Sequence, residues 1–587
     1  MRDIVIGMAG SGGDGIVSAG ESLIAAAASL GFHAMMTKSF GPQIRGGESS
    51  CRVRLSTQKL HSSGGALGVA IALNWEDFLK FGSELRCDPN TVVIYEAKTG
   101  VAPEQIPLGD LKAKEVLAVP LAELTKQSAG TEKAKNSLVL GLLSGWLGLS
   151  QDTLRKGIQR RYGKKGEEIV NGNLRAFEAG RQYAEAHPTQ TPLRLDAPAA
   201  ATTKILTDGN DITAAAAIFA GCQFFGGYPI TPSSEVMQFL GKEIWKYGGA
   251  LLQAEDEIAG IGTAVGASFG GKKAMTATSG PGMSLKTEIL GLATIAELPL
   301  VVVNVQRGGP STGLPTKPEQ SDLFQACFSA HGDVLRPVLA PTSVADSFHC
   351  TVDAFNIAER YQTPVIILSD QEIAQRKETC DPIDTSKLVV EERKRPTPEQ
   401  LEKYTRFASS PDGISPISHP GMKGGAYLAA GIEHTESGAP SASGAVHARM
   451  NDKRFNKLLP LESWSGAVTV AGDAGADLAL IAWGSIGGVA LEVLDLAQAE
   501  GLRLKVLVPR LLYPVPKEVY RGFLRNVNAG LVVEQSHQGQ LYKILRMDLD
   551  LPKGLVSYCR SGANPIQPSE VLAKLKALSA DARRSLS

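Results

Sequence analysis

Short apolar runs alternate with amphipathic stretches through the middle of the chain, between residues 204 and 379. Each pair of runs is separated by a segment with helical spacing. Strands that alternate with helices in this way pair in parallel and are covered on both faces. We therefore predict an α/β domain over residues 204–379. Its expected strands lie near residues 224–228, 250–253, 274–277, 300–305 and 365–368.

The same alternation recurs, in shorter form, on both sides of this block. Residues 1–187 open with a strand over 4–8, a glycine turn GSGGDG and a helix over 16–30. Residues 465–587 form a third block, and its expected strands lie near residues 478–483, 505–508 and 530–534. The fold class is thus multidomain α/β, which agrees with a length of 587 residues and domains of ~150 residues.

Two stretches interrupt the alternation and mark domain boundaries. Residues 188–203 are rich in Pro, Ala and Thr, as in an interdomain linker. Residues 380–464 combine charged runs such as VVEERKRPTPEQ with Pro- and Gly-rich segments. They predict an irregular connector between the middle and C-terminal blocks.

Composition excludes several classes of partner. The 60 basic and 60 acidic side chains cancel, so no global field attracts nucleic acid or an anionic membrane. The longest apolar run, residues 137–147, is far shorter than the ~20 residues that span a bilayer. The N-terminus lacks the pattern of a secretory signal. Seven cysteines are scattered without a CxxC pair, so we expect reduced thiols in a cytoplasmic protein.

The segment GGYPITPSSE follows the first predicted strand of the middle block. Pro229 and Pro232 bias Ile230 and Thr231 away from helical geometry, and the serine pair after them can cap the next helix. Thr231 is therefore expected at the carboxyl end of a strand, where ligands bind in open α/β sheets. A purely structural turn is the alternative.

A second candidate, Glu257, begins a helix of small residues in QAEDEIAGIGTAVGASFGG. An acid at a helix start is favoured by the helix dipole, and small residues allow close approach of another helix or a planar cofactor. Glu255 is the competing candidate, and a simple helix cap is the structural alternative. The next strand, turn and helix, TATSGPGMS, favour a functional interpretation.

A third candidate, Arg307, leaves the strand near residues 300–305 into the loop RGGPSTGLPTKPEQ. That position directs a guanidinium to the edge of the sheet where ligands bind. Arginine offers two parallel donors to a carboxylate. A lone arginine beside glycines is usually a surface-loop residue, so the other motifs decide its interpretation.

The segments YPITPSSE, EDEIAGIGTAVGAS, TSGPG and RGGPSTGLPT, in this order, resemble the pyrimidine-binding domain of 2-oxoacid:ferredoxin oxidoreductases. Thiamine-diphosphate enzymes carry a Glu at a helix start and a Gly nine positions later. Glu257 and Gly266 match that spacing, whereas Glu255 leads to Ala264. The resemblance implies that Glu257 hydrogen-bonds N1′ of the aminopyrimidine, a role that a partly buried Glu with a raised pKa suits.

The resemblance also implies roles for residues around Glu257. It makes Thr231 and Arg307 catalytic and 2-oxoacid-binding residues, with Thr316 in the same binding set. It places Pro229 and Ile230 against the cofactor. The cofactor supplies the nucleophile and the electron sink, and the protein positions it.

The diphosphate half of a thiamine site is missing from the sequence. It requires GDG followed some two dozen residues later by an Asn that holds Mg²⁺, but the GDG at residues 13–15 has no Asn until Asn74. By the resemblance, a separate beta subunit supplies the diphosphate site, Mg²⁺ and an iron–sulfur cluster of the 4Fe-4S type. Thiamine diphosphate would be shared at the interface, in a heterodimer that forms a dimer of heterodimers.

The outer blocks also resemble parts of these enzymes. Residues 1–187 look like the gamma domain through GMAGSGGDG and FGPQIRGGESSCRVRLS, and Arg45 and Gly46 are expected in a loop near the active site or the coenzyme A channel. A dinucleotide site is disfavoured because no acidic residue ends a second strand. Residues 465–587 resemble the transketolase C-terminal-like domain, where His537 is interpreted as structural.

These resemblances imply a fused gamma–alpha subunit of a 2-oxoacid:ferredoxin oxidoreductase. The family reaction converts a 2-oxoacid, coenzyme A and oxidised ferredoxin to acyl-CoA, CO₂ and reduced ferredoxin, and some members run in the carboxylating direction of the reductive TCA cycle. The gamma-before-alpha order favours 2-oxoglutarate. Pyruvate and branched-chain 2-oxoacids stay open, with Lys317 as a speculative partner for a second carboxylate.

Three alternatives remain at the level of sequence. The basic run from His447 to Leu458 predicts a solvated helix face or a contact with coenzyme A phosphate. The chain could be a subunit of a non-redox thiamine enzyme, such as a transketolase half, whose complex would lack an iron–sulfur chromophore. It could also be a catalytically silent chain that binds a nucleotide at its glycine-rich N-terminus.

Overall fold

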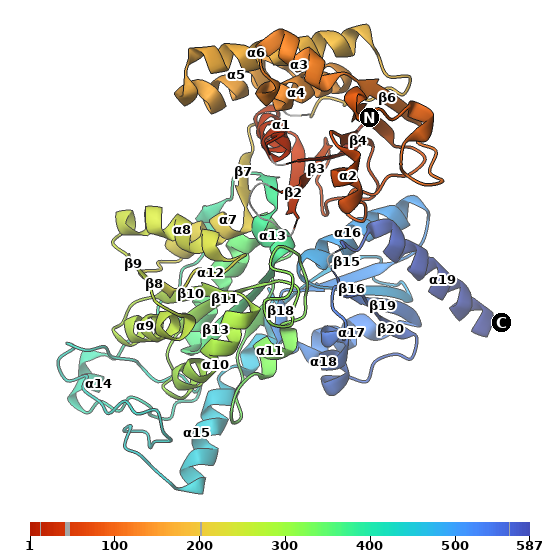
Figure 1. Ribbon diagram of the computed structural model, residues 1–587. Helices are drawn as coiled ribbons and strands as arrows, with labels where there is room; N and C mark the ends of the chain where they lie inside the picture. Colours follow the sequence, from red (N-terminus) through yellow and green to blue (C-terminus); the bar gives the residue numbers. More distant parts are fainter. Residues whose placement is uncertain (12, 42–46, 200–201, 563, 587) are drawn as a thin grey trace. The chain divides into compact units, whose positions relative to one another are not determined.

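The computed structural model describes residues 1–11, 13–41, 47–199, 202–562 and 564–586 (Figure 1). Gly12 of the glycine turn, and Arg45 and Gly46 of the second N-terminal motif, lie outside the described residues. The described chain divides into two compact units. One unit comprises Met1–Thr207 and Arg376–Ile383, and the other comprises Asp208–Gln375 and Asp384–Ser587.

The first unit is a mixed sheet with helices packed beside it. Its strands are β1 (Asp3–Gly10), β2 (His33–Phe40), β3 (Ser49–Ser56), β4 (Val69–Ala72), β5 (Val92–Glu96), β6 (Glu115–Val119), β7 (Ile205–Asp208) and β14 (Lys377–Cys380). Its helices are α1 (Ile16–Leu30), α2 (Trp75–Lys80), α3 (Leu121–Ala129), α4 (Lys135–Leu147), α5 (Gln151–Tyr162) and α6 (Glu167–Ala186). Helices α3 to α6 lie together as one layer (Figure 1).

The strand order in this sheet is β6-β5-β4-β1-β3-β2-β14-β7. The pairs β1/β4, β4/β5 and β5/β6 are parallel, and β3 is antiparallel to β1 and β2. Helix α1 has the predicted bounds and ends at Gly31, whose φ of 85° is in the left-handed region that glycine tolerates. The predicted strand–turn–helix opening of the chain is therefore confirmed.

A strand from the end of the middle block completes this sheet. β14 pairs antiparallel with β2, with Lys377 opposite Met36. The Thr379 hydroxyl accepts a hydrogen bond from the backbone N–H of Ala34 at 2.7 Å. The composition change near residue 380 thus falls at a strand that pairs with the N-terminal block.

The second unit contains the predicted parallel sheet. Its strands are β8 (Phe224–Gly227), β9 (Ala250–Gln253), β10 (Ala274–Thr278), β11 (Leu300–Gln306), β12 (Val338–Leu339), β13 (Pro364–Asp370) and β18 (Leu511–Tyr513). The accompanying helices are α7 (Gly209–Phe219), α8 (Ser234–Glu243), α9 (Glu257–Phe269), α10 (Gly280–Ile295), α11 (Leu323–Phe328), α12 (Val344–Tyr361) and α13 (Gln371–Gln375). The five strands expected here are confirmed to within two residues at each end.

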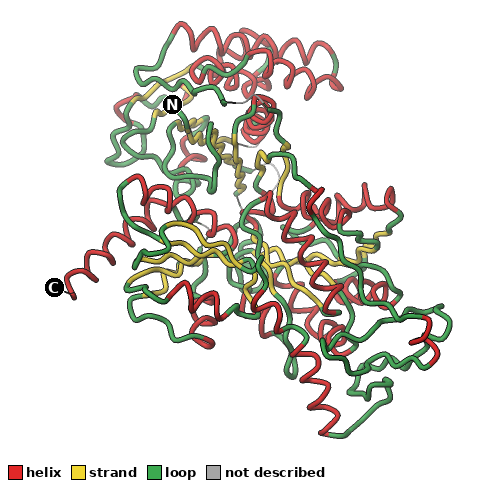
Figure 2. The backbone as a smooth tube through the Cα atoms, turned by 180° about the vertical axis from the view of Figure 1, so that it is seen from behind, coloured by secondary structure: helices red, strands yellow, loops and turns green. Residues whose placement is uncertain are grey.

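The strand order is β18-β12-β13-β11-β10-β8-β9, and the pairs are parallel except for β12/β18. Helices lie on both sides of these strands (Figure 2). β11 and β13 are buried along their whole length, which explains the apolar runs with which both strands begin. The carboxyl ends of β8, β10 and β11 lead into the motif segments.

The C-terminal block forms a smaller sheet with order β15-β17-β16-β19-β20. Its elements are β15 (Val468–Gly472), β16 (Leu478–Ala482), α16 (Gly484–Ala499), β17 (Lys505–Pro509), α17 (Lys517–Leu524), β19 (Ala529–Glu534), α18 (Gln540–Asp548), β20 (Leu555–Cys559) and α19 (Pro568–Leu586). Apolar residues of this sheet and of the parallel sheet share one core, to which Ile261, Val302, Ile481 and Leu507 belong. The two sheets are therefore packed as one unit.

The connector contains the short helix α14 (Pro398–Glu402) and the helix α15 (Gly444–Asn456) among long loops (Figure 1). Its charged residues act as anchors. The buried Arg393 guanidinium donates to both carboxylate oxygens of Glu359, at 2.7 and 2.6 Å, and to the Ser268 carbonyl at 2.7 Å. The charged sequence of this segment thus serves internal ion pairs and hydrogen bonds.

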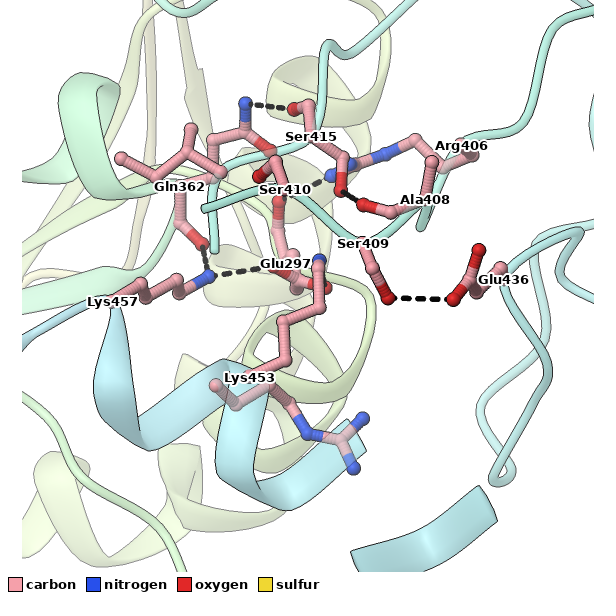
Figure 3. A network of polar contacts seen from close by, with 12 residues as sticks. Glu297, Gln362, Arg406, Ala408, Ser409, Ser410, Ser415, Glu436, Lys453 and Lys457 are labelled. Carbon is pink, nitrogen blue, oxygen red and sulfur yellow. Dashed lines mark hydrogen bonds and ion pairs between the residues drawn. The ribbon is translucent and has the colours of Figure 1, made fainter. Parts of the chain in front are cut away.

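A second buried charge cluster joins the end of α15 to Glu297, two residues after α10 (Figure 3). Glu297 is fully buried, and its carboxylate pairs with the ammonium groups of Lys453 and Lys457. Arg406 of the connector donates to the Glu297 carbonyl at 2.8 Å. Burial would raise the pKa of Glu297, but Lys457 and Lys453 outweigh it and hold the pKa below its ordinary value.

Residues 447–458 were predicted to form a solvated basic face. For Lys453, Arg454 and Lys457 this prediction is wrong, because their side chains are buried. Lys453 and Lys457 pair with Glu297, and Arg454 pairs with Glu433 at 2.7 Å. The helical periodicity could not reveal these ion pairs, because Glu297 lies about 160 positions before the lysines in the sequence. These three cations are engaged internally, which disfavours the coenzyme A phosphate alternative for them.

The cysteines are free thiols, and five of the seven are buried. Burial raises the pKa of Cys51, Cys222 and Cys380 to about 12, so these thiols are poor nucleophiles. Among the described helices, none is both long and apolar enough to cross a bilayer.

Candidate active site

The turn after β8 presents Thr231 at the carboxyl edge of the parallel sheet. Thr231 is exposed, and Pro229 and Ile230 are half-buried. The Asn210 amide donates to the Pro232 carbonyl at 2.7 Å and holds the turn from α7. The expected side-chain cap is absent: α8 begins at Ser234, and the Ser233 hydroxyl donates to the Ile230 carbonyl at 3.0 Å instead.

Glu257 is the first residue of α9 and is buried. The helix cap is its neighbour Asp256, whose carboxylate accepts from the backbone N–H of Ala259 at 2.7 Å. Capping therefore does not require Glu257. Glu255, the competing candidate, is exposed on the preceding turn.

Glycines permit the close packing around α9. A Cβ on Gly260 would lie 2.9 Å from Cα of Gly227, so the start of the helix packs directly against the end of β8. Gly266, one of the motif residues, is exposed, and a Cβ added there would have no atom of the described chain within 4 Å. The small-residue face of α9 therefore packs on β8 at one side and is open at Gly266.

Helix α10 contacts Glu257 through Gly282, the second glycine of the GPG turn. A Cβ on Gly282 would lie 2.8 Å from Cγ and 2.9 Å from Oε1 of Glu257. The missing side chain thus leaves room for the carboxylate. One turn further on, the Lys286 ammonium donates to the Glu257 carbonyl at 2.8 Å. Sequence reasoning did not single out Lys286, because a lysine within an apolar helix gives no local signal of its partner.

Arg307 follows β11 and is buried. Its Nη1 donates to the Thr231 carbonyl, so the structure brings these two predicted residues together. Its Nε is buried and has no hydrogen-bond partner among the described residues. An unpartnered guanidinium N–H at a strand end is suited to a ligand carboxylate.

The loop after Arg307 is held by its own backbone. Gly308 and Leu314 form an antiparallel bridge, and the Gly308 N–H donates to the Lys317 carbonyl at 3.0 Å. Gly313 has a φ of 43°, and a Cβ there would lie 2.0 Å from the Gly308 carbonyl oxygen, so glycine is required. Thr316 is half-buried in this loop.

A cavity of about 940 Å³ opens beside Arg307, between the start of α10 and the C-terminal sheet. Arg307 lines it, whereas Glu257, Thr231 and Thr316 are outside its lining. Thr231 is connected to it through Arg307, and Glu257 adjoins its Gly280–Pro281 wall through Gly282. The C-terminal block also lines the cavity, with His537, Gln538, Gln540, Ser561 and Gly562. No local pattern in the sequence indicates this shared lining.

The segment between the loop and α11 is tied to the C-terminal block. The Gln320 amide donates to the Trp483 carbonyl at 2.7 Å and accepts from the Gln535 N–H at 3.0 Å. The Gln540 amide donates to the Ser321 carbonyl at 2.8 Å. The C-terminal block thus fixes the far end of the arginine loop.

Asp322 lies in the cavity wall and was not singled out from the sequence. The Asn304 amide donates to its carboxylate at 3.1 Å. Burial raises the pKa of Asp322 to about 6, against the opposing effect of Asn304. The folded protein therefore binds this proton more tightly than the unfolded chain, and folding stability falls as pH rises from about 4 to about 6.

Replacing Asp322 with Asn is therefore expected to stabilise the protein above pH 7, by about 1–3 kcal/mol. The advantage should shrink as pH is lowered from 7 to 4, because the native carboxyl then becomes neutral as well. Urea denaturation of both proteins at pH 8 and pH 4.5 measures the difference. An equal effect at both pH values would contradict the raised pKa.

Among the described residues, no group of three or more His, Cys, Asp or Glu side chains is arranged to hold a metal ion. The residues present do fit one half of a thiamine cofactor. Glu257 is a buried carboxylate beside a glycine that leaves it room, and α9 provides small residues close to it.

Family models match most of the chain. Residues 215–452 match "Pyruvate flavodoxin/ferredoxin oxidoreductase, thiamine diP-bdg", residues 5–183 match "Pyruvate ferredoxin/flavodoxin oxidoreductase", and residues 476–571 match "Pyruvate:ferredoxin oxidoreductase core domain II". The chain belongs to the 2-oxoacid:ferredoxin oxidoreductase family. It is thus related to oxidoreductases, which disfavours the non-redox alternative.

Individual relatives extend over nearly the whole chain. The 2-oxoglutarate oxidoreductase subunit KorA of Mycobacterium tuberculosis is 32% identical, over 93% of this chain and 87% of the relative. The 2-oxoacid:ferredoxin oxidoreductase 2 subunit alpha of Aeropyrum pernix is 29% identical, over 98% of each chain. The solved 2-oxoglutarate:ferredoxin oxidoreductase from Magnetococcus marinus is 38% identical, with a TM-score of 0.92, over 98% of this chain and 100% of that chain. The predicted fold class is confirmed.

Proposed function

We propose that this chain binds the aminopyrimidine half of thiamine diphosphate through Glu257 and oxidatively decarboxylates a 2-oxoacid with coenzyme A, passing electrons to ferredoxin. The observation that carries the proposal is the placement of a buried Glu257 carboxylate against Gly282 at the start of α9. Arg307, whose Nη1 donates to the Thr231 carbonyl, supplies a substrate-binding group.

Each proposed site residue has a task that its position permits. Glu257 accepts a hydrogen bond from N1′ of the aminopyrimidine and holds that proton. Arg307 binds the substrate carboxylate with the N–H groups that Thr231 leaves free. The exposed Thr231 hydroxyl and Thr316 complete the substrate side, and Pro229 and Ile230 contact the pyrimidine ring. When bound, the cofactor supplies the nucleophilic carbon and the electron sink for decarboxylation.

We propose 2-oxoglutarate as the substrate. The Mycobacterium tuberculosis relative is named for 2-oxoglutarate, and the Magnetococcus marinus structure has 2-oxoglutarate, coenzyme A and succinyl-CoA bound. Pyruvate and branched-chain 2-oxoacids are the alternatives. The reaction could be driven in the carboxylating direction by reduced ferredoxin.

We further propose that the site is completed by a beta subunit, which carries the diphosphate site, Mg²⁺ and a 4Fe-4S cluster, in a dimer of heterodimers. Apolar side chains around Glu257 support a partner surface, because they are between 38% and 50% exposed. They come from the β8 turn, β9, α9 and α10. These residues are Tyr228, Leu252, Ile258 and Leu285.

The substrate proposal is tested with the purified complex, a viologen dye, coenzyme A and a panel of 2-oxoacids. We expect the highest kcat/KM with 2-oxoglutarate, and lower values with pyruvate and branched-chain 2-oxoacids. A higher kcat/KM with pyruvate would replace the substrate assignment but leave the reaction class intact. No turnover with any 2-oxoacid would contradict the proposed function itself.

A further inference from the structure

Lys286 is a buried charge beside Glu257 that the proposed function does not use. Its side chain is fully buried on α10, one turn after Gly282. Its Nζ donates to the Glu257 carbonyl at 2.8 Å. Within the described chain, Nζ has no other hydrogen-bond acceptor and forms no ion pair with a carboxylate.

This placement is unfavourable for stability alone. An ammonium loses its hydration when buried, and here no carboxylate of the described chain is in contact to replace it. It also lies at the start of α9, where the helix dipole is positive and disfavours a cation. Burial lowers the pKa of Lys286 to about 8, while the nearby carboxylates of Glu257 and Asp256 act in the opposite direction.

The charges around Lys286 identify Glu257 as the group on which it acts. Helix α10 packs against α9, β11 and β13. From α9, the facing acids are Glu257 and Asp256, and Asp256 is exposed and caps its own helix. β11 carries no charged residue, the β13 carboxylate Asp370 accepts from backbone N–H groups elsewhere, and Glu288 on α10 is exposed.

We propose that Lys286 is a positioning residue that fixes the backbone of Glu257 and thereby orients the Glu257 carboxylate for its hydrogen bond to the aminopyrimidine. The inference rests on the proposed role of Glu257. Two features of one α10 face act together. Gly282 leaves space for the Glu257 side chain, and Lys286 holds the Glu257 carbonyl.

The test compares Lys286→Met and Lys286→Arg in the complex with its partner subunit. Loss of the ammonium removes the hydrogen bond that holds the Glu257 carbonyl, so the Glu257 carboxylate is less well placed for the cofactor. We expect Lys286→Met to lower kcat/KM by about tenfold, with about tenfold weaker thiamine diphosphate binding. Lys286→Arg keeps a donor and a positive charge and should restore most of both values. Glu288→Gln, on the same helix, controls for the loss of an exposed charge.

A Lys286→Met complex with unaltered kcat/KM and unaltered cofactor affinity, and only a lower thermal midpoint, would overturn the inference. If that variant does not fold, Lys286→Gln retains a donor without the charge and is judged by the same two measurements. Failure of the proposed function looks different, because the Glu257→Ala complex would then retain turnover. An inactive Glu257→Ala complex together with an unaltered Lys286→Met complex sinks this inference alone.

Discussion

Replacing Glu257 with Ala is expected to reduce turnover of the complex by about 10³-fold, within the range seen when a positioned acid–base group is lost. The cause is local. The buried carboxylate is the group proposed to hold the N1′ proton, and Asp256 already caps α9, so the helix should persist without Glu257. Viologen reduction with coenzyme A and a 2-oxoacid measures the loss.

Two matched variants show what such a loss means. Glu255→Ala removes the competing, exposed carboxylate two residues earlier and should leave turnover unaffected. Gly266→Leu adds a side chain at a position where a Cβ would have no atom of the described chain within 4 Å, so the chain should fold but bind its partner poorly. Glu257→Ala should still co-elute with the partner in gel filtration. Full activity in Glu257→Ala, or loss of activity in Glu255→Ala instead, would contradict the assignment.

The largest expected effect on stability comes from Glu297→Gln. This change removes the carboxylate that two lysines share and leaves both ammonium groups buried (Figure 3). Breaking a buried ion pair by removing one partner costs about 3–5 kcal/mol. We therefore expect the thermal midpoint to fall by about 5 °C, measured by calorimetry or circular dichroism.

Glu243→Gln is the matched control for Glu297→Gln. It removes the same charge from an exposed pair with Lys246 and should cost less than about 1 kcal/mol. A Lys453→Met, Lys457→Met, Glu297→Met triple variant replaces the cluster by apolar side chains. It should recover much of the stability, because burial of unpaired charge is what destabilises the single variant. Equal melting of Glu297→Gln and the native protein would refute the charged cluster.

The elements of the parallel sheet could be predicted from sequence because their pattern is local. β9 has the predicted bounds, and α1 does as well, because apolar runs and helical spacing reflect burial directly. The pairing of strands is harder to predict, because it depends on residues far apart in the sequence. The addition of β14 to the N-terminal sheet, beside β2 more than 300 residues earlier, had no signal in the sequence around Lys377.

The candidate site also has some features that the local sequence predicts and others that depend on long-range packing. The sequence placed Thr231 and Arg307 at strand ends and Glu257 at a helix start, and the structure joins Arg307 to Thr231. It could not show that Lys286 reaches the Glu257 carbonyl, or that His537 lines the same cavity as Arg307, because both depend on packing between distant elements. The roles of Thr316, Pro229 and Ile230 stay predictions.

Long-range charge pairing was the least predictable feature. A basic helix with Lys453 and Lys457 has the pattern of a solvated face, yet both lysines are buried. Their partner Glu297 follows α10, and the helix that begins at Gly280 beside the site therefore ends at this cluster. The spacing of residues within a helix shows which positions are polar. It does not show whether a residue of opposite charge, distant in the sequence, pairs with them in the interior.

The central claim is a thiamine-dependent oxidative decarboxylation of a 2-oxoacid. It is tested most directly by the release of labelled CO₂ from carboxyl-labelled 2-oxoglutarate by the purified complex. We expect release that requires coenzyme A and thiamine diphosphate, with two electrons passed to the viologen dye for each CO₂ formed. No release, or release without electron transfer to the dye, would contradict the account.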